Sequence, residues 1–557
     1  MSNKRPATSS LLEGKPDEED SVDRPISSSQ DENEKAKPKS LKFKLTVFFL
    51  ALVTVIGSMD AVIVGSALAA IAKDLQSSSV ESFWVGTSFL LSQTVTIPLY
   101  GTTSEIFGRK WPILIAISIF LVGSILCATA KTITWLIGAR VVQGIGAGGM
   151  IQLVQVILSD ISTMSERGLY MAIAAFAWSL GTNIGIPIGG AIWGEDDLAV
   201  DLLYQYPRLR DLYRGVALQQ DTSSFVKKLG MLDWVGLGVF TCASTLFLVG
   251  LTSGGVSHPW GSAAVLVPLV LGAVLFPVFI FTQWRVSKRP MMPLRIFNDR
   301  SAIVGFVTSF LHGLVFWCVT YYMIVFFLGA LQHSVLHASL ETMTCIAYSA
   351  PAGLVASMLV KRTQHFKYII VVGWALLAAG MGTNITMHPD SSKAMLYGPR
   401  VLISLGGGLL FPTPIFAVQA RQHGDDIGIA TSIQVFTRSM GTAFGVGLGG
   451  VIFQNQWSKD VDSAVTAGRI PHELFVGSNV AETAYEVIRK FPEAVQEAYR
   501  GVYADSLATM WYVMMGLSVA GFLVSFVGRN DVISGGLAGK QNFKDERKGD
   551  LEGGRSG

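Results

Sequence analysis

Long apolar stretches recur along almost the whole chain, and they restrict its possible folds more than any other feature. Each has about 20 residues, the length at which one α-helix crosses the hydrocarbon core of a bilayer. No soluble domain separates them. The thirteen stretches have the approximate limits 45–70, 82–100, 111–130, 133–158, 169–193, 234–252, 264–284, 302–328, 338–360, 368–387, 396–418, 431–453 and 508–528. The sequence therefore predicts an all-α polytopic membrane protein.

The composition agrees with this prediction. Half of the 557 residues are hydrophobic and 15% are charged, whereas a soluble protein has about 25% charged residues. The net charge of +3 is too small to indicate a nucleic-acid partner. Residues 1–44 and 529–557 mix both signs of charge and have little to bury, so we expect both to be disordered cytoplasmic tails.

The basic residues of the short loops predict the orientation, because such loops stay on the cytoplasmic side. Together with both tails we assign to the cytoplasm Arg109, Lys110, Arg167, Lys227, Lys228 and the loops 283–300, 361–367 and 421–426.

This assignment conflicts with the number of spans. The stretch 169–193 must end outside and 234–252 must start inside, yet 194–230 contains no apolar run. Its charges, among them Asp201 and Arg208, would each cost about 2.5–3.5 kcal/mol at the centre of a span.

Three glycine-rich blocks follow one another in the first half of the chain. They are "GTTSEIFGRK" at 101–110, "RVVQGIGAGG" at 140–149 and "GTNIGIPIGG" at 181–190. With the first-span block around Asp60 and the later "VFTRSMGTAFGVGLGG", they resemble the major facilitator superfamily, specifically its fungal drug:proton antiporters with fourteen spans. The match departs from the family pattern at Thr103, Glu105 and Ile186, where Leu, Asp and Pro are usual.

The resemblance implies two six-helix bundles with two extra spans between them. The N-terminal bundle would occupy 45–230, with 195–226 aberrant, and the linking spans 231–290. The C-terminal bundle would comprise five spans in 291–453, an extracellular loop at 454–507 and a last span at 508–528. The resemblance also implies a cytoplasmic gate latch of Gly101, Glu105, Gly108, Arg109 and Lys110, and an antiporter motif of Gly181, Gly185, Pro187, Gly189 and Gly190.

The sixth span of this pattern is missing at the charged segment. Relatives continue the antiporter motif with a segment like W-R-W-x-F-Y-I-N-x-P. Back-translated with permitted codons and read one base later, residues 197–208 give T-W-R-W-I-F-Y-I-N-I-P-A. We therefore hypothesise that about 195–220 is a frame-shifted reading of the sixth span. A gene-model error, a sequencing error and a real splice variant remain open as causes.

Ionisable residues inside spans are costly without partners, which makes them the first candidates for a transport site. Burial favours the neutral form of a carboxyl, so Asp60 is the predicted proton-coupling residue and Arg140 its partner. Gln143 and Arg438 complete the predicted coupling and substrate site, although each also fits a packing role. His312 and Glu341 lie in spans too.

Other chemistry finds little support in the sequence. His333 and His337 stand four apart, but without a third ligand near the pair we predict neither a metal site nor a cofactor. The chain has no repeated His boxes, no nucleotide-binding loop and no Ser–His–Asp pattern that we can place, so we do not expect an enzyme.

The leading interpretation is a monomeric exporter in the plasma membrane that exchanges small amphipathic organic molecules, such as drugs or toxins, for protons by alternating access. The alternatives are a vacuolar or plasma-membrane transporter of basic amino acids or iron chelates, and a product that does not transport because its sixth span is damaged.

Overall fold

A computed structural model of the chain describes residues 41–75, 79–162, 164–192, 232–254, 258–287, 290–422 and 426–529. These residues form helices and contain no strand of a sheet. Ten helical stretches among them are long and apolar enough to cross a membrane. The main helices are α1 (Leu41–Asp74), α2 (Ser79–Phe107), α3 (Lys110–Ala128), α4 (Ile133–Ile161), α5 (Met164–Ile192), α9 (Trp234–Ser253), α10 (Ala263–Phe281), α11 (Arg300–Gly329), α12 (Val335–Thr342), α13 (Ser349–Thr363), α14 (Lys367–Asn384), α15 (Lys393–Leu410), α16 (Thr413–Gln419), α17 (Asp426–Thr466), α18 (Tyr485–Ile488) and α19 (Glu493–Ser525).

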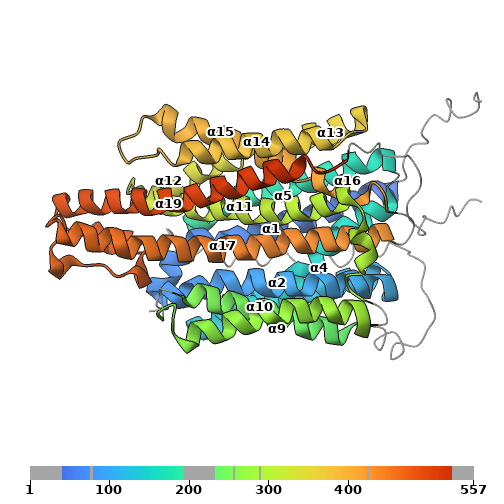
Figure 1. Ribbon diagram of the computed structural model, residues 1–557, viewed down its shortest axis with the longest axis horizontal. Coiled ribbons are helices and arrows are strands. Elements are labelled where there is room, and N and C mark those ends of the chain that lie inside the picture. The colour runs from blue at the N-terminus through green and yellow to red at the C-terminus, as the bar shows by residue number, and fades with distance from the viewer. Residues whose placement is uncertain are drawn as a thin grey trace, which may run out of the picture.

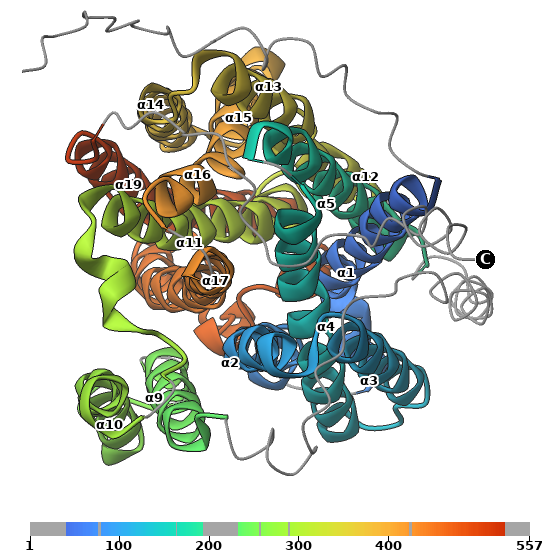
Figure 2. The ribbon, with the colours of Figure 1, turned by 90° about the vertical axis from the view of Figure 1, so that its right-hand side faces the viewer.

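The helices run side by side along the long axis of the molecule (Figure 1). Seen from one end, α1 to α5 form one group and α11 to α19 another, with the pair α9–α10 at the edge (Figure 2). The pair contacts both groups, since α9 packs against α2 and α17, and the ring centroid of Phe240 lies 4.8 Å from that of Phe436. Each of the thirteen predicted stretches falls on one helix or on two consecutive helices, which confirms the predicted fold class.

Two of these stretches are interrupted in the middle of the bundle. The stretch 338–360 divides into α12 and α13, with a short 3-10 turn at Met343–Cys345 between them. The stretch 396–418 divides into α15 and α16 at Phe411 and Pro412. Pro412 directly precedes α16 and cannot donate a backbone hydrogen bond, so it ends α15 and starts α16. Broken helices expose backbone and side chains at mid-bundle, where transporters bind substrate.

The two ends of the bundle differ, and the described residues of the basic loops at 109–110, 283–300, 361–367 and 421–426 lie at one of them (Figure 1). At this basic end, Lys367 Nζ donates to the Phe526 carbonyl oxygen at 2.9 Å, and Arg295 Nη2 lies 2.7 Å from Asp426 Oδ1. The other end, which we call the distal end, carries the ends of α11 and α17 and the beginning of α19. That the basic end faces the cytoplasm remains a prediction.

Helices occupy much of the segment 454–507, which was expected to be a loop. The helix α17 continues to Thr466 and α19 already begins at Glu493, so the two project together beyond the rest of the bundle (Figure 1). Aromatic packing holds them, with the ring centroid of Trp457 4.6 Å from Tyr503 and 5.9 Å from Tyr499. Hydropathy detects only the apolar length of a helix. It therefore missed these extensions, because they are polar on their outer face.

The connection between these two helices contains a buried carboxyl. The side chain of Glu482 is buried, and its Oε1 accepts a hydrogen bond from Gln454 Nε2 at 2.7 Å. Burial raises the pKa of Glu482 from 4.5 to about 7. The folded protein therefore holds this proton at pH values at which the unfolded chain has lost it.

We expect this proton to make the stability of the distal end depend on pH. A raised carboxyl pKa stabilises the folded state at low pH, and that contribution is lost as the pH rises from 4.5 through about 7. The loss amounts to about 3 kcal/mol. Glu482→Gln stays neutral and keeps the acceptor, so its melting temperature should fall less between pH 5 and pH 8 than that of the unaltered protein. Glu473→Gln, which alters an exposed residue of the same connection, is the control; equal pH profiles in all three proteins would contradict the expectation.

The segment 195–226, which the frame argument concerns, lies outside the described residues, as do both predicted tails except for residues 41–44 and Arg529. The frame-shift hypothesis and the predicted domain limits therefore stay predictions.

Candidate functional site

Asp60, Arg140 and Gln143 come from α1 and α4, and the fold brings them together. Arg140 Nη1 lies 2.8 Å from Asp60 Oδ2, and Gln143 Nε2 donates to Asp60 Oδ1 at 2.8 Å. Arg140 Nη1 also donates to Gln143 Oε1 at 2.6 Å. Each member of this network thus contacts the other two, and both carboxylate oxygens of Asp60 have a donor. Asp60 and Arg140 are 80 positions apart in the chain.

The surroundings of Arg140 make the network rigid. The guanidinium lies 4.0 Å above the ring centroid of Phe89 on α2, and its Nε donates to the carbonyl oxygen of Val85 at 3.4 Å. Arg140 and Gln143 are buried, while the side chain of Asp60 is 23% exposed. A buried cation of this kind is stable only while a charged partner or other hydrogen-bond acceptors compensate it.

Glycines of the predicted antiporter motif set the distance between α5 and α1. A Cβ at Gly181 would lie 2.3 Å from the carbonyl oxygen of Val55, and one at Gly185 would lie 2.7 Å from that of Met59. Small residues permit such close helix contacts in membranes. Met59 directly precedes Asp60, so these glycines fix the helix that carries the carboxyl. Pro187 lies inside α5; Gly189 and Gly190 also belong to α5, and their surroundings fall outside the description.

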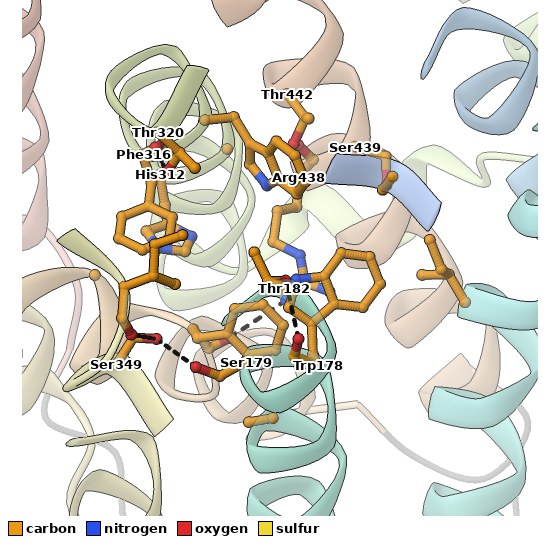
Figure 3. A pocket seen from close by; sticks show the side chains of 18 of the residues that line it. Trp178, Ser179, Thr182, His312, Phe316, Thr320, Ser349, Arg438, Ser439 and Thr442 are labelled. Carbon is orange, nitrogen blue, oxygen red and sulfur yellow. Dashed lines mark hydrogen bonds between the residues drawn. The ribbon is translucent and has the colours of Figure 1, made fainter. Parts of the chain in front are cut away.

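A central cavity lies beside the network, between the two groups of helices. Ala61, next to Asp60, belongs to its wall. Figure 3 shows side chains of α5, α11 and α17 pointing into it. The N-terminal group contributes Ala61, Leu90, Gln93, Ile151, Ala175, Trp178, Ser179 and Thr182, and the other group contributes His312, Gly313, Phe316, Trp317, Thr320, Ile346, Ser349, Gly407, Phe411, Arg438, Ser439 and Thr442. Both helix breaks reach the cavity, through Ile346 and Phe411.

Aromatic rings form much of the cavity wall, and a few polar groups interrupt it. The ring centroid of Trp178 lies 6.5 Å from that of Trp317 and 6.3 Å from that of Phe411. Ser179 and Ser349 share a hydrogen bond of 2.8 Å that joins the two groups of helices. The Oε1 atom of Gln93 is buried without a hydrogen-bond partner in the described structure. Sites for organic ligands combine an apolar wall with a few polar groups in this way.

Arg438 enters the cavity and does not join the Asp60 network. Its guanidinium lies 4.2 Å above the ring centroid of Phe411, and its Nη1 donates to the Phe411 carbonyl oxygen at 3.4 Å. Among the described residues, the cavity wall contains no carboxylate. The predicted set therefore divides into a carboxylate network of Asp60, Arg140 and Gln143 and a separate cavity with one cation.

Of the predicted latch residues, Gly101, Glu105 and Arg109 lie close to the other group of helices at the basic end. Gly101 of α2 approaches α17 so closely that a Cβ there would lie 2.9 Å from Ser432 Oγ. A Cβ at Gly428, also in α17, would lie 3.7 Å from both Arg109 Nη2 and Glu105 Oε1. Gly108 has φ of 77°, a left-handed conformation that glycine adopts without strain. Lys110 begins α3 directly after Arg109.

The ion pair of Arg109 has a partner that the sequence analysis did not name. Arg109 Nε lies 2.8 Å from Asp160 Oδ2 at the end of α4, and its Nη1 donates to Ser104 Oγ at 2.7 Å. Asp160 is 51 positions away, so the motif around Arg109 contains no sign of it. Arg109 thus ties α2 to α4 and presents its remaining nitrogen toward α17.

We expect Arg109→Ala and Asp160→Asn to lower transport by similar factors, because each breaks the same pair next to α17. Coupling between conformations is typically about 1–3 kcal/mol, which corresponds to about 5–150-fold. Transport rates at matched protein levels test this, with the double variant no worse than either single one. Arg362→Ala, which alters an exposed residue at the same end, should transport normally. Unchanged rates in the Arg109 and Asp160 variants would reduce these residues to structural roles.

The residues that line the cavity were mostly missed by sequence reasoning. Trp178, Ser179 and Phe316 are ordinary in spanning helices, and nothing in their spacing marks them. The third potential metal ligand was missed as well: Glu341 lies beside both His333 and His337, with the ligand atoms of all three within 4.8 Å of one another. Its position four residues after His337 was the available signal.

Comparisons with known proteins agree with this architecture. The sequence model of the Major Facilitator Superfamily matches residues 50–195, and that of the fungal trichothecene efflux pump matches residues 198–534. The chain is 29% identical over 513 residues to the MFS-type efflux pump MMF1 of Mycosarcoma maydis, which covers 90% of this chain and 82% of that protein. It is 30% identical over 506 residues to the MFS transporter L2 of a Phoma species, covering 89% and 84%.

A solved structure shares the fold at low sequence identity. It is a bacterial homolog of the human lysosomal transporter Spinster in an inward-facing, unoccupied conformation. The TM-score is 0.55 at 14% identity, with 88% of this chain and 98% of that chain covered. At this identity the likeness concerns the arrangement of helices alone.

Proposed function

Because this chain belongs to the fungal trichothecene efflux pump family of the major facilitator superfamily, we propose that it exports small amphipathic organic molecules in exchange for protons. It is a multi-pass membrane protein, and its homologues are efflux pumps. The observation that carries the exchange mechanism is the carboxylate of Asp60, held by Arg140 Nη1 and Gln143 Nε2 beside the central cavity.

Proton binding at Asp60 would change the forces within the N-terminal group of helices. The ionised carboxylate attracts the buried Arg140 guanidinium at 2.8 Å, and this attraction ties α1 to α4. A proton on Asp60 removes this charge–charge attraction, and the cationic guanidinium then donates only to a neutral acceptor, which is a weaker bond. The ionised and protonated forms therefore favour different positions of α1, whose next residue, Ala61, lines the cavity. Through α1, a proton on Asp60 can therefore alter the substrate site.

The cavity supports a particular class of substrate. Its rings offer an apolar surface, whereas Arg438, Gln93 and the hydroxyl groups offer hydrogen bonds to oxygen atoms. One cation and no carboxylate among the described wall residues favour a neutral or anionic oxygenated compound over a cation. Terpenoid and polyketide toxins have this chemistry, and a trichothecene is the natural first probe. The same observation argues against basic amino acids, which were an alternative from sequence.

The latch and the central hydrogen bond support alternating access. Arg109, Gly101 and Ser432 bring the two groups of helices together at the basic end, and Ser179 meets Ser349 at the cavity. Export from the cytoplasm requires this end to open and to close again, and such closely packed, small-residue contacts allow two discrete arrangements. We place the protein in the plasma membrane with this end inside, and we expect it to act as a monomer.

Inside-out membrane vesicles test the proposal directly. With the lumen more acidic than the medium, we expect a radiolabelled trichothecene to accumulate in vesicles that contain the chain, and a protonophore to abolish the accumulation. Labelled lysine should not accumulate, and vesicles without the chain are the blank. Accumulation of lysine, or trichothecene accumulation that ignores the pH gradient, would contradict the proposed exchange. Binding of the trichothecene without any transport would favour the alternative of a non-transporting product.

A further inference from the structure

Three potential metal ligands meet at the distal end, where α11 leads into α12. His333 Nδ1 lies 2.7 Å from Glu341 Oε2, and His337 Nε2 lies 3.4 Å from Glu341 Oε1. His337 and Glu341 are four residues apart on α12 and share one face of the helix. Two imidazole nitrogens and a carboxylate are the ligand set of open zinc sites, in which water takes the fourth position.

Backbone hydrogen bonds hold His333 and His337 in position. Ser334 caps α12 by accepting a hydrogen bond from the His337 backbone nitrogen at 3.4 Å. The backbone nitrogen of His333 donates to the Phe327 carbonyl oxygen at 3.0 Å, and its own carbonyl oxygen accepts a hydrogen bond from Arg489. Preorganisation of this kind lowers the entropic cost of collecting ligands around an ion.

A tyrosine orients the carboxylate of Glu341. The Tyr397 hydroxyl on α15 donates to Glu341 Oε1, in the manner of the outer partners that hold metal-binding carboxylates. The carboxylate is buried and the two imidazoles face the medium. The side chain of Glu341 is 8% exposed, that of His333 34% and that of His337 64%. An ion from the surrounding solution can therefore reach the two imidazoles without any opening of the bundle.

We propose that His333, His337 and Glu341 form a binding site for a divalent transition-metal ion of the zinc class. Imidazole ligands favour Zn²⁺, Co²⁺ and Ni²⁺ over Mg²⁺ and Ca²⁺, which prefer oxygen ligands only. The ligand atoms need to rearrange only slightly, because in a tetrahedral zinc site they lie roughly 3.4 Å apart and here all fall within 4.8 Å of one another.

Occupation of this site restrains a helix that contacts both groups. The short helix α12 packs against α11 on one side and α5 on the other. Thr342, the residue after Glu341, lines a second cavity together with Val62 and Ile186 of the N-terminal group. An ion that joins α12 to the end of α11 therefore holds α12 in its place between the two groups of helices at the distal end.

Calorimetric titration of the purified protein with Zn²⁺ tests the site. We expect one ion per chain, with affinity reduced at least tenfold in His337→Ala and about tenfold in Tyr397→Phe, which removes only the orienting hydrogen bond. His472→Ala alters an exposed histidine of the distal end and should bind as the unaltered protein does. Equal affinity in His337→Ala and His472→Ala, or no binding by the unaltered protein, would overturn the proposal.

Hydrogen exchange provides a readout that does not depend on transport. Zn²⁺ should slow amide exchange across 335–342 in the unaltered protein and in His472→Ala, but not in His337→Ala. The double variant His333→Ala and His337→Ala guards against misfolding, because its exchange without metal should match that of the unaltered protein elsewhere in the bundle. Slowing by Zn²⁺ in this double variant would show that the ion acts elsewhere.

Discussion

Efflux driven by a pH gradient is expected to fall to background in an Asp60→Asn variant, while exchange of labelled for unlabelled substrate continues. Asparagine keeps the shape and can still accept from Arg140, but it cannot bind and release a proton. Exchange needs substrate binding in the cavity, whose wall does not contain Asp60, and it needs no net movement of protons. Counterflow and pH-driven accumulation, measured in the same vesicles, separate the two properties.

The stability of the variant requires its own control, because Arg140 loses a charged partner. Removing one member of a buried ion pair costs about 3–5 kcal/mol, although the partial exposure of Asp60 lowers that cost. Asp60→Glu keeps the charge and should retain some coupling. A second variant, Asp60→Asn with Arg140→Gln, removes the unpaired cation and should recover protein yield without recovering coupling. Uphill, pH-driven export by Asp60→Asn would show that the residue is structural and that the proton binds elsewhere.

The helices could be predicted from sequence because a bilayer imposes one requirement on every span. Apolar length revealed all thirteen stretches, yet it could not reveal the breaks at 343–348 and 411–412, where hydrophobic residues continue through the interruption. Pro412 and Pro414 carried that information for the second break. Hydropathy also ended the helix of 431–453 too early, because α17 continues as a polar helix supported by Trp457 against α19.

Sequence predicted the site residues that are energetically costly inside a membrane. It did not predict those whose types are common in spanning helices. A charge inside a span demands a partner, and this reasoning paired Asp60 with Arg140. For Arg109 the family resemblance implied a latch with Glu105, whereas its ion-pair partner Asp160 lies at the far end of another helix. Trp178 and Ser349 became visible only through the packing of two groups of helices. For Glu341, the spacing from His337 was visible in sequence, but its contact with His333 depended on the turn before α12.

Gly181→Ala is expected to reduce coupled transport by about tenfold or more, although it adds one methyl group. The new Cβ would lie 2.1 Å from Ser58 Oγ and 2.3 Å from the Val55 carbonyl oxygen. The serine can rotate, but the carbonyl belongs to the backbone, so α1 and α5 must separate by roughly 1 Å to restore ordinary contact. Overpacking of this kind costs about 1–3 kcal/mol, and each 1.4 kcal/mol is a factor of ten.

The direction of that displacement connects the glycine to the proton site. Asp60 lies on α1 only two residues beyond Ser58, and its bonds to Arg140 and Gln143 are 2.8 Å long, so a shift of α1 away from α5 changes these bonds first. Coupling, measured as pH-driven accumulation relative to counterflow, should therefore fall further than counterflow itself. Gly57→Ala, on the α1 helix that would be displaced, is the control, because its Cβ would meet only Met150 Cε at 3.6 Å. If Gly181→Ala and Gly57→Ala transported and coupled alike, the close contact of α5 with α1 would have no part in holding Asp60 in place.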